Sequence, residues 1–336
     1  MRALWIMIIG ILCFSAGSTA AQEPPANPQA PFSPCVNLGN MLEAPNEGEW
    51  GVRVEESYLP TIAAAGFKAV RIPVRWSAHA AAEAPYTINE AFLARVTQVV
   101  DWALAAELEV VLNVHHYEEL MAQPQDHIAR LIALWEQIGE HFADYPPTLA
   151  FELLNEPNTR LDTTIWNVTY PKLITAVRAS NPTRTLILGG AEWNGLYALR
   201  RFSMPIERDN LIITFHYYEP FQFTHQGAEW VNGADAWLGQ RWGTDDHYSA
   251  IERDFAFASE WSARYGVPLW LGEFGAYEKA DLPSRQLYTQ AVREAAERNG
   301  IGWCYWEFAS GFGIYDAAAK QFKPLFEALI PPQRGS

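Results

Sequence analysis

Short apolar runs recur along the chain and alternate with longer stretches in which apolar residues return every three or four positions. Uninterrupted apolar runs of about four to eight residues are typical of strands buried on both faces, whereas the wider spacing is typical of amphipathic helices. The runs predict strands at Cys35 to Gly39, Ala69 to Val74, Val110 to Val114, Leu149 to Leu154, Thr185 to Leu188, Leu211 to Phe215, Pro268 to Gly272 and Gly302 to Tyr305. The periodic stretches predict helices at Val54 to Ala65, Asn89 to Ala106, Gln125 to His141, Ile165 to Ser180, Ile251 to Tyr265 and Leu282 to Asn299.

This alternation of strands and helices sets the fold class. Parallel strands covered by helices form either a closed (β/α)8 barrel or an open, doubly wound sheet. Eight strand–helix units in roughly 300 residues match a barrel of ordinary size. No GxGxxG turn follows the first strand to favour the open sheet. We therefore predict an α/β protein with a single-domain (β/α)8 TIM barrel over residues 35–331.

Residues 1–34 differ in character from the rest. Arg2, the apolar run Leu4 to Phe14 and the small residues Ser18 to Ala21 have the layout of a secretory signal peptide over residues 1–21. Residues 22–34 are rich in proline, which is typical of an extended tether. No later apolar run is long enough to cross a bilayer. The sequence thus predicts a secreted protein, extracellular or periplasmic after signal removal, with no membrane partner.

The net charge of the chain argues against anionic binding partners. The chain carries a formal charge of −15, whereas nucleic acids and anionic membranes are bound mainly through Lys and Arg. A neutral substrate fits better, and 14 tryptophans suggest platforms on which sugar rings stack. We expect no nucleic-acid partner, and we expect a monomer.

Two of the predicted strands lead into a glutamate. The stretch LAFELLNEP contains Glu156 near its end, and LWLGEFG contains Glu273. A buried carboxylate costs several kcal/mol if unpaired, so each is either a solvated loop residue or a group that a site uses. Because active sites of (β/α)8 barrels lie at the carboxyl ends of the strands, we interpret the two as a catalytic pair. One carboxyl group can protonate the leaving oxygen of a glycosidic bond while the other engages the anomeric centre.

Other polar and aromatic residues follow the strands and are expected to converge on the same mouth. Arg71 is a permanent cation and Tyr218 a hydrogen-bond donor, and either one beside Glu273 would keep that carboxylate ionised. Adjacent histidines on a strand point to opposite faces, so at most one of His115 and His116 is expected to point inward. The predicted mouth also holds Asn40, Asn155, Trp193, His216, Trp306 and Glu307.

A metal-dependent hydrolase is the alternative reaction class. Metallohydrolase barrels usually need a His-x-His pair and a further strand-end acid or histidine, and no HxH occurs in this sequence. We therefore predict no metal and no organic cofactor.

An aromatic-rich segment follows the sixth predicted strand, at residues 219–243. Flat aromatic rings stack on pyranose rings while His and Glu bind hydroxyls, and long barrel loops carry specificity. We interpret Trp230 and His225 as part of the wall of the sugar-binding subsites. Trp237 and Trp242 belong either to that wall or to a lid packed on its own aromatics.

Cys35 and Cys304 fall on the first and last predicted strands, which adjoin when a barrel closes. An oxidising compartment permits a disulfide. However, disulfide geometry is strict, and neighbouring strands often place side chains on opposite faces. Two separate buried thiols are therefore expected.

Four short motifs resemble those of a known family, the family 5 glycoside hydrolases, which are retaining barrel enzymes that include many cellulases and mannanases. The motifs are LNEP at Leu154 to Pro157, HYY at His216 to Tyr218, GEFG at Gly272 to Gly275 and YWEF at Tyr305 to Phe308. Longer stretches such as NVHHYEEL and FTHQGAEWV are similar to thermophilic bacterial endoglucanases that act on β-1,4-glucans and β-mannans.

This resemblance covers about Val36 to Leu329 and implies roles for individual residues. It implies Glu156 as general acid/base, Asn155 as a contact of the sugar 2-hydroxyl and Glu273 as nucleophile. It also implies active-site positions for Arg71, His115, His216, Tyr218 and Trp306.

The combined prediction is a secreted, retaining endo-β-1,4-glycanase that acts on a β-1,4-linked polysaccharide, with β-1,4-glucan preferred. An endo-β-1,4-mannanase or a bifunctional enzyme is the alternative, because glucose and mannose differ only at the 2-hydroxyl. A non-catalytic sugar-binding barrel would keep the aromatic platforms and lose one glutamate, whereas both glutamates are present. Discrimination between the sugars is expected to depend on placements around Asn40, Glu43, His115, Asn155 and His225.

Overall fold

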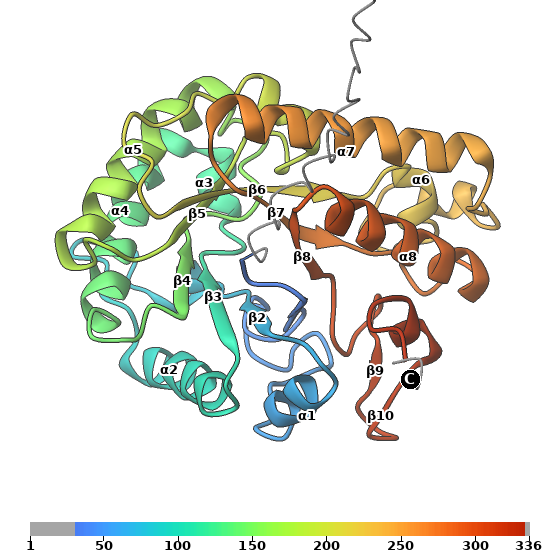
Figure 1. The fold of residues 1–336 in the computed structure, drawn as a ribbon. Helices are drawn as coiled ribbons and strands as arrows, with labels where there is room; N and C mark the ends of the chain where they lie inside the picture. The colour runs from blue at the N-terminus through green and yellow to red at the C-terminus, as the bar shows by residue number, and fades with distance from the viewer. Residues whose placement is uncertain (1–30, 333–336) are drawn as a thin grey trace, which may run out of the picture.

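The chain folds into a closed barrel of eight parallel strands that follow one another in sequence order around the barrel (Figure 1). The computed structural model describes residues 31–332, so the predicted signal peptide and most of the predicted tether lie outside the described residues. The barrel confirms the predicted α/β class and (β/α)8 architecture. The strands are β1 (Cys35–Asn37), β2 (Ala69–Ile72), β3 (Glu109–Asn113), β4 (Leu149–Glu152), β5 (Leu186–Gly189), β6 (Leu211–Tyr217), β7 (Leu269–Phe274) and β8 (Gly302–Tyr305).

Helices surround the strands on the outside of the barrel (Figure 1). The six predicted helices are present as α1 (Tyr58–Ala64), α2 (Glu90–Ala105), α4 (Pro124–His141), α5 (Thr163–Ser180), α7 (Asp245–Tyr265) and α8 (Leu282–Arg298). Helix α7 begins earlier than predicted, because its first turn is acidic and is capped by Thr244, features that apolar periodicity does not register. The connections hold α3 (Glu118–Ala122), α6 (Phe221–Thr224) and the 3-10 helices η1 (Trp76–His79), η2 (Leu196–Arg200) and η3 (Ala234–Trp237). The segment after β8 holds the strand pair β9 (Tyr315–Asp316) and β10 (Gln321–Phe322) and the 3-10 helix η4 (Pro324–Ala328).

Of the helices in the described range 31–332, none has both the length and the apolar character that a bilayer-spanning segment requires.

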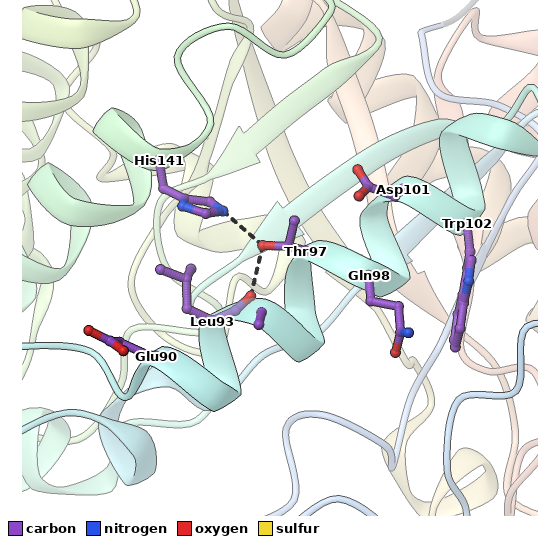
Figure 2. A pocket seen from close by; sticks show the side chains of 8 residues that line it. Glu90, Leu93, Thr97, Gln98, Asp101, Trp102 and His141 are labelled. Carbon is purple, nitrogen blue, oxygen red and sulfur yellow. Dashed lines mark hydrogen bonds between the residues drawn. The ribbon is translucent and has the colours of Figure 1, made fainter.

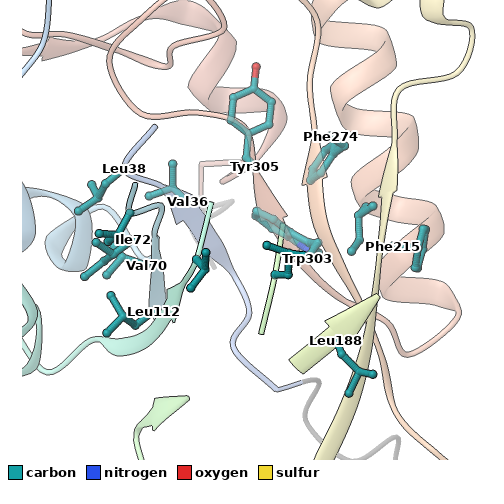
Figure 3. Close-up of a cluster of buried hydrophobic side chains, with 14 of the residues drawn as sticks. Val36, Leu38, Val70, Ile72, Leu112, Leu188, Phe215, Phe274, Trp303 and Tyr305 are labelled. Carbon is teal, nitrogen blue, oxygen red and sulfur yellow. The ribbon is translucent and has the colours of Figure 1, made fainter. Parts of the chain in front are cut away.

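Side chains alternate along each strand between two apolar layers. The outward layer packs between the strands and the helices, and Figure 3 shows part of it, including Val36, Val70, Leu112, Leu188, Phe215 and Trp303. The inward layer closes the amino-terminal end of the barrel and is called the barrel floor here. It consists of Phe32, Cys35, Ala69, Val111, Ala150, Ile187, Ile212, Trp270 and Cys304.

Two residues beyond the floor, the inward positions of five strands become polar. Because side chains on a strand alternate with a period of two, these positions form a second layer stacked on the floor toward the carboxyl ends of the strands. All five residues have 0% exposure, and the side chains of all but Thr214 are hydrogen-bonded within the barrel. This polar layer consists of Asn37, Arg71, Asn113, Glu152 and Thr214.

Cys35 and Cys304 form a disulfide, so the expectation of two separate thiols was wrong. The two residues are direct register partners on β1 and β8, and their Cα atoms lie 4.2 Å apart. Register partners on neighbouring parallel strands point to the same face, and here that face is the barrel floor. The sequence does not reveal this register, which depends on the stagger of the closed barrel.

Candidate active site

Glu156 and Glu273 meet at the carboxyl end of the barrel. Glu156 lies in the loop after β4, and Glu273 lies near the end of β7. A carboxylate oxygen of each and Nδ1 of His216 all lie within 4.8 Å of one another. The Glu156 side chain is 26% exposed and that of Glu273 is 6% exposed. One carboxyl group is therefore open to the mouth, and the other is almost enclosed.

A β-bulge aims Glu273 into the mouth. In the pairing of β6 with β7, Phe215 lies opposite Leu271 whereas His216 lies opposite Glu273, so Gly272 is an extra residue on β7. Such a bulge redirects the side chains around it and is common beside active sites.

The backbone at Glu156 is also irregular. Its φ of 47° lies in the left-handed region, which non-glycine residues adopt uncommonly. Residues held in such conformations cluster at functional sites, where the surrounding structure maintains them.

Arg71 links the two carboxylate strands from below. Its guanidinium donates to both oxygens of Glu152 at 2.5 and 2.8 Å and to Oε1 of Glu273 at 2.6 Å. It also donates to the side-chain oxygens of Asn37 and Asn155, at 2.8 and 2.7 Å. A buried guanidinium is stable only if its donors and its charge are satisfied, and here two carboxylates and two amides do so.

Glu152 is an important residue that the sequence analysis missed. The stretch LAFELL was interpreted as an uninterrupted apolar strand, yet Glu152 occupies an inward position two residues after Ala150. An acidic residue inside an apolar strand was the available signal. Its structural role is clear from the contacts, because its two carboxylate oxygens accept two hydrogen bonds from the buried Arg71 guanidinium and so fix that side chain in place.

The two candidate catalytic carboxyl groups have different partners. Glu273 receives a hydrogen bond from Arg71 and another from the hydroxyl of Tyr218 at 2.9 Å. Glu156 has neither of these donors and instead contacts His216.

These partners separate the protonation states of the two groups. Burial raises the pKa of Glu156 to about 8, with Glu152 adding to the rise and Arg71 opposing it. Burial also raises the pKa of Glu273 above its ordinary value, but His216 and Arg71 oppose this rise. Glu156 is therefore suited to hold a proton, and Glu273 to act as the carboxylate.

His216 stands between the two glutamates. Its Nδ1 lies 2.7 Å from Oε1 of Glu156 and 3.6 Å from Oε2 of Glu273. Burial lowers the pKa of His216 to about 4, so the imidazole is neutral at neutral pH.

His115 and His116 do not lie on opposite faces, contrary to expectation. Their ring centroids are 4.7 Å apart in an edge contact, because β3 ends at Asn113 and the strict alternation of a strand ends with it. His115 is buried and stacks in parallel with Trp306, at 5.5 Å between centroids. His116 meets Trp50, a 40% exposed residue that the sequence analysis did not single out. These four rings form a continuous row at the mouth.

Glu43 and Glu307 are buried next to this row. Glu43 accepts hydrogen bonds from the backbone N–H groups of Asn40 and Met41, and Glu307 accepts from three backbone N–H groups of its own loop. Burial raises the pKa of Glu43 to about 8 and that of Glu307 to about 7. The loop after β1 also lies close to the last strand, since a Cβ on Gly39 would be only 3.0 Å from Trp306 and Glu307.

The aromatic segment after β6 divides into two parts. Trp230 is 60% exposed, and His225 is buried below it with its ring stacked on Phe221. Trp242 is buried against Tyr288 of α8 and Tyr248 of α7, so it belongs to the packing against these helices and not to an exposed wall.

Trp193 lies after β5 and is 54% exposed. It is the middle one of three consecutive residues with left-handed backbone, with φ between 52° and 66°. The structure thus places an open aromatic face on a locally constrained loop.

Within residues 31–332, Glu156, His216 and Glu273 also form a cluster with ligand atoms close enough together to be considered for a metal ion. Zinc holds such ligand atoms at about 2.0–2.2 Å from a common centre. Here Nδ1 of His216 is already paired with Glu156, and the Arg71 cation lies 2.6 Å from Glu273. The fixed guanidinium supplies the positive charge at this point and would repel a metal ion.

A surface depression lies elsewhere, along the outer side of α2. It is lined by Glu90, Leu93, Thr97, Trp102, His141 and neighbouring residues, and Thr97 joins His141 through a hydrogen bond (Figure 2). Because α2 covers the outside of the barrel, this depression is separate from the strand ends and holds none of the carboxylate chemistry described above.

Comparison with known proteins gives a consistent family. Residues 32–311 match the family model described as Cellulase (glycosyl hydrolase family 5). Endoglucanase H of Acetivibrio thermocellus is 38% identical over 304 residues, which cover 88% of this chain and 32% of that protein. The crystal structure of endoglucanase Cel5A from Thermotoga maritima is 49% identical, with a TM-score of 0.86, covering 88% of this chain and 96% of that one. Structures of the same enzyme with mannotriose and with cellobiose are each 48% identical, with a TM-score of 0.87. The chain spans about a third of the length of the first two curated relatives that it matches.

Proposed function

Because the chain belongs to glycosyl hydrolase family 5, we propose that it is an endo-β-1,4-glucanase that retains the anomeric configuration, with Glu156 as acid/base and Glu273 as nucleophile. One observation carries the mechanism. In retaining glycosidases the two carboxyl groups are about 5–5.5 Å apart, whereas inverting enzymes need about 6.5–9.5 Å to admit a water. Carboxylate oxygens within 4.8 Å of one another fit the shorter separation.

The contacts support a double displacement. Arg71 and Tyr218 hold the Glu273 carboxylate for attack on the anomeric carbon, while the Glu156 proton passes to the departing glycosidic oxygen. A glycosyl ester on Glu273 results, and Glu156 then takes a proton from the water that hydrolyses this ester. The Glu156 pKa of about 8, raised by burial, keeps the acid protonated at neutral pH.

The substrate class follows from the mouth and the relatives. His115, Trp306 and His116 with Trp50 offer flat faces, and Asn155 offers an amide group, features that suit a neutral sugar chain. Endoglucanase relatives favour a β-1,4-glucan. The mannotriose-bound structure of a 48% identical enzyme favours β-1,4-mannan as a second substrate.

We also propose that the protein is secreted, to the outside or to the periplasm. The layout of residues 1–21 supports this proposal, and so does the Cys35–Cys304 disulfide, since disulfides persist mainly in oxidising compartments. The monomeric state remains a prediction.

The test is release of new reducing ends from carboxymethylcellulose, barley β-glucan, xyloglucan, glucomannan and galactomannan. We expect release by the wild type, loss in Glu273→Gln, and wild-type rates in Glu260→Gln, a matched control on the exposed side of α7. The ratio of kcat/KM on glucan to that on mannan decides the preferred substrate. No release from any polymer by the folded wild type would contradict the proposal and favour a sugar-binding barrel, and inhibition by EDTA would favour metal catalysis.

The stereochemistry is checked separately. Proton NMR of the first product formed from a cello-oligosaccharide should show the β-anomer before mutarotation. An initial α-anomer would mean inversion and would contradict the assignment of Glu273 as nucleophile.

A further inference from the structure

Thr214 and His216 each have one buried polar atom that lacks a hydrogen-bond partner within the described part of the chain. These atoms are Oγ1 of Thr214 and Nε2 of His216, and the residues are 0% and 3% exposed. Burying a polar atom without a hydrogen-bond partner is unfavourable, because the atom gives up its hydrogen bonds to water. Nearly all buried polar atoms in folded proteins are therefore paired. Two unpaired atoms next to a catalytic pair therefore require a physical explanation.

The two atoms face the same small space in the barrel. Both side chains come from the inward face of β6, above Ile212 of the barrel floor. A Cβ on Gly272 would lie 2.6 Å from Thr214 Oγ1 and 3.2 Å from His216 Nε2. Because Gly272 has no side chain, the position that its Cβ would occupy stays open next to both atoms, and a water bound there would be within hydrogen-bond reach of the hydroxyl and of the ring nitrogen.

The opposite nitrogen of the same ring faces the candidate acid. Nδ1 of His216 lies 2.7 Å from Oε1 of Glu156, and a neutral imidazole carries its proton on only one nitrogen. With the proton on Nδ1, His216 donates to Oε1 and leaves the carboxyl proton of Glu156 on the other oxygen, available to the leaving group. With the proton on Nε2, Nδ1 becomes an acceptor and draws the Glu156 proton to itself.

We infer that Thr214 is a positioning residue for the reaction: its hydroxyl donates a hydrogen bond to Nε2 of His216, directly or through one water, and holds the ring in the Nδ1–H form. In this proposal Thr214 does not contact the substrate. It acts through His216, which keeps the Glu156 proton on the carboxyl oxygen that faces the leaving group. The inference rests on the proposed role of Glu156. It extends that role to a residue that lies below the mouth, in the polar layer.

Among residues 31–332, the charged and polar groups around the His216 ring do not hydrogen-bond to its Nε2 atom. Arg71 on β2 donates to Glu152 on β4 and to Glu273 on β7, and Tyr218 on β6 donates to Glu273. None of them is bonded to Nε2 among the described residues. Burial lowers the pKa of His216 to about 4, which keeps the ring neutral at neutral pH, so the choice between the two neutral forms matters there.

Three variants separate the hydroxyl from the shape of the side chain. Thr214→Val keeps the shape and removes the hydroxyl, Thr214→Ser keeps the hydroxyl, and Thr289→Val removes another buried, unpaired hydroxyl on α8 as a matched control. On cello-oligosaccharides we expect Thr214→Val to lower kcat about tenfold, or about 1.4 kcal/mol, with KM nearly unchanged. Thr214→Ser and Thr289→Val should keep wild-type kcat.

A second substrate distinguishes positioning from general damage. Dinitrophenolate departs from a dinitrophenyl cellobioside without a proton, so the defect of Thr214→Val in kcat/KM, which reports the step that forms the Glu273 ester, should disappear on that substrate. An equal loss on both substrates would overturn the inference. If Thr214→Val does not fold, Thr214→Ala compared with Thr214→Ser on the two substrates tests the hydroxyl in a smaller side chain.

The tautomer is read directly by ¹⁵N NMR of labelled histidine, with His216 assigned by the signals lost in His216→Asn. We expect the Nδ1–H form in the wild type and in Thr214→Ser, and a shift toward Nε2–H in Thr214→Val. An unchanged tautomer in Thr214→Val, or Nε2–H in the wild type, would overturn the inference. This readout needs no turnover, so an inactive wild type with the expected tautomers would contradict the proposed function and leave the Thr214 contact standing.

Discussion

Arg71→Met tests the network that supports both glutamate strands. Arg71 is fully buried and supplies the only positive charge in direct contact with Glu152 and Glu273 among the described residues. Methionine has a similar length and no charge, so the substitution leaves two buried carboxylates without their cation. Breaking a buried ion pair by removing one partner costs about 3–5 kcal/mol. Because two carboxylates lose the same partner here, we expect a loss in the free energy of unfolding at the upper end of that range.

The size of this loss should depend on pH with a defined sign. In the wild type, the Arg71 guanidinium opposes the rise in the Glu273 pKa that burial causes. Without the guanidinium, that pKa rises further above its ordinary value. A carboxyl group with a raised folded-state pKa keeps its stability below the unfolded pKa of about 4.3 and loses it as the pH rises through the folded value. The variant should therefore approach the wild type near pH 4 and be weakest above neutrality.

The assay is guanidinium unfolding at about pH 4 and about pH 7.5, followed by circular dichroism. A second substitution, Glu152→Gln in the Arg71→Met background, removes one of the stranded charges and should recover part of the stability. It should not recover activity, because Glu273 still lacks its cation. A loss below about 1 kcal/mol at the higher pH, or an equal loss at both values, would refute the reasoning.

Three further measurements address other parts of the structure. On an unactivated cello-oligosaccharide, kcat/KM should fall as the pH rises through about 8, because burial raises the pKa of Glu156, the proposed acid, to that value; a profile flat to pH 10 would contradict the assignment. Replacing Cys35 and Cys304 by serine should cost about 2–5 kcal/mol and lower Tm by several degrees while kcat stays within about twofold, as scanning calorimetry and initial rates would show; an unchanged Tm would contradict it. Trp50→Ala should lower kcat/KM about fivefold to twelvefold on long cello-oligosaccharides and much less on short ones, because covering about 40–60 Å² of apolar surface contributes about 1–1.5 kcal/mol; equal losses at all lengths would place Trp50 outside the sugar path.

The strands and their order were predictable because each apolar run is short and bounded, and because parallel strands buried on both faces need continuous apolar sequence. The helix boundaries were predicted less accurately from the sequence. Helix α7 begins at Asp245 rather than Ile251, since the capping box at Thr244 is polar and carries no periodic signal.

Site residues at the strand ends could be predicted from the sequence, whereas site residues inside the barrel were harder to predict. Glu156 and Glu273 stood out as glutamates next to apolar runs. Glu152 did not, because its meaning depends on the inward face of β4 and on Arg71 across the barrel. The register that joins Cys35 to Cys304 likewise arises from barrel closure, which no local pattern records.

The disulfide gives the chain the topology of a ring. The seam between β1 and β8 is the one strand contact of the barrel made by elements from opposite ends of the sequence, and the Cys35–Cys304 bond spans 269 positions across it. A protease that cuts any loop between these cysteines therefore opens the ring without releasing a fragment, because both pieces stay joined at the floor. Where proteases are abundant, the two pieces of a nicked molecule therefore stay at high effective concentration. This favours renewed pairing of their strands into the barrel, although the cut peptide bond stays open.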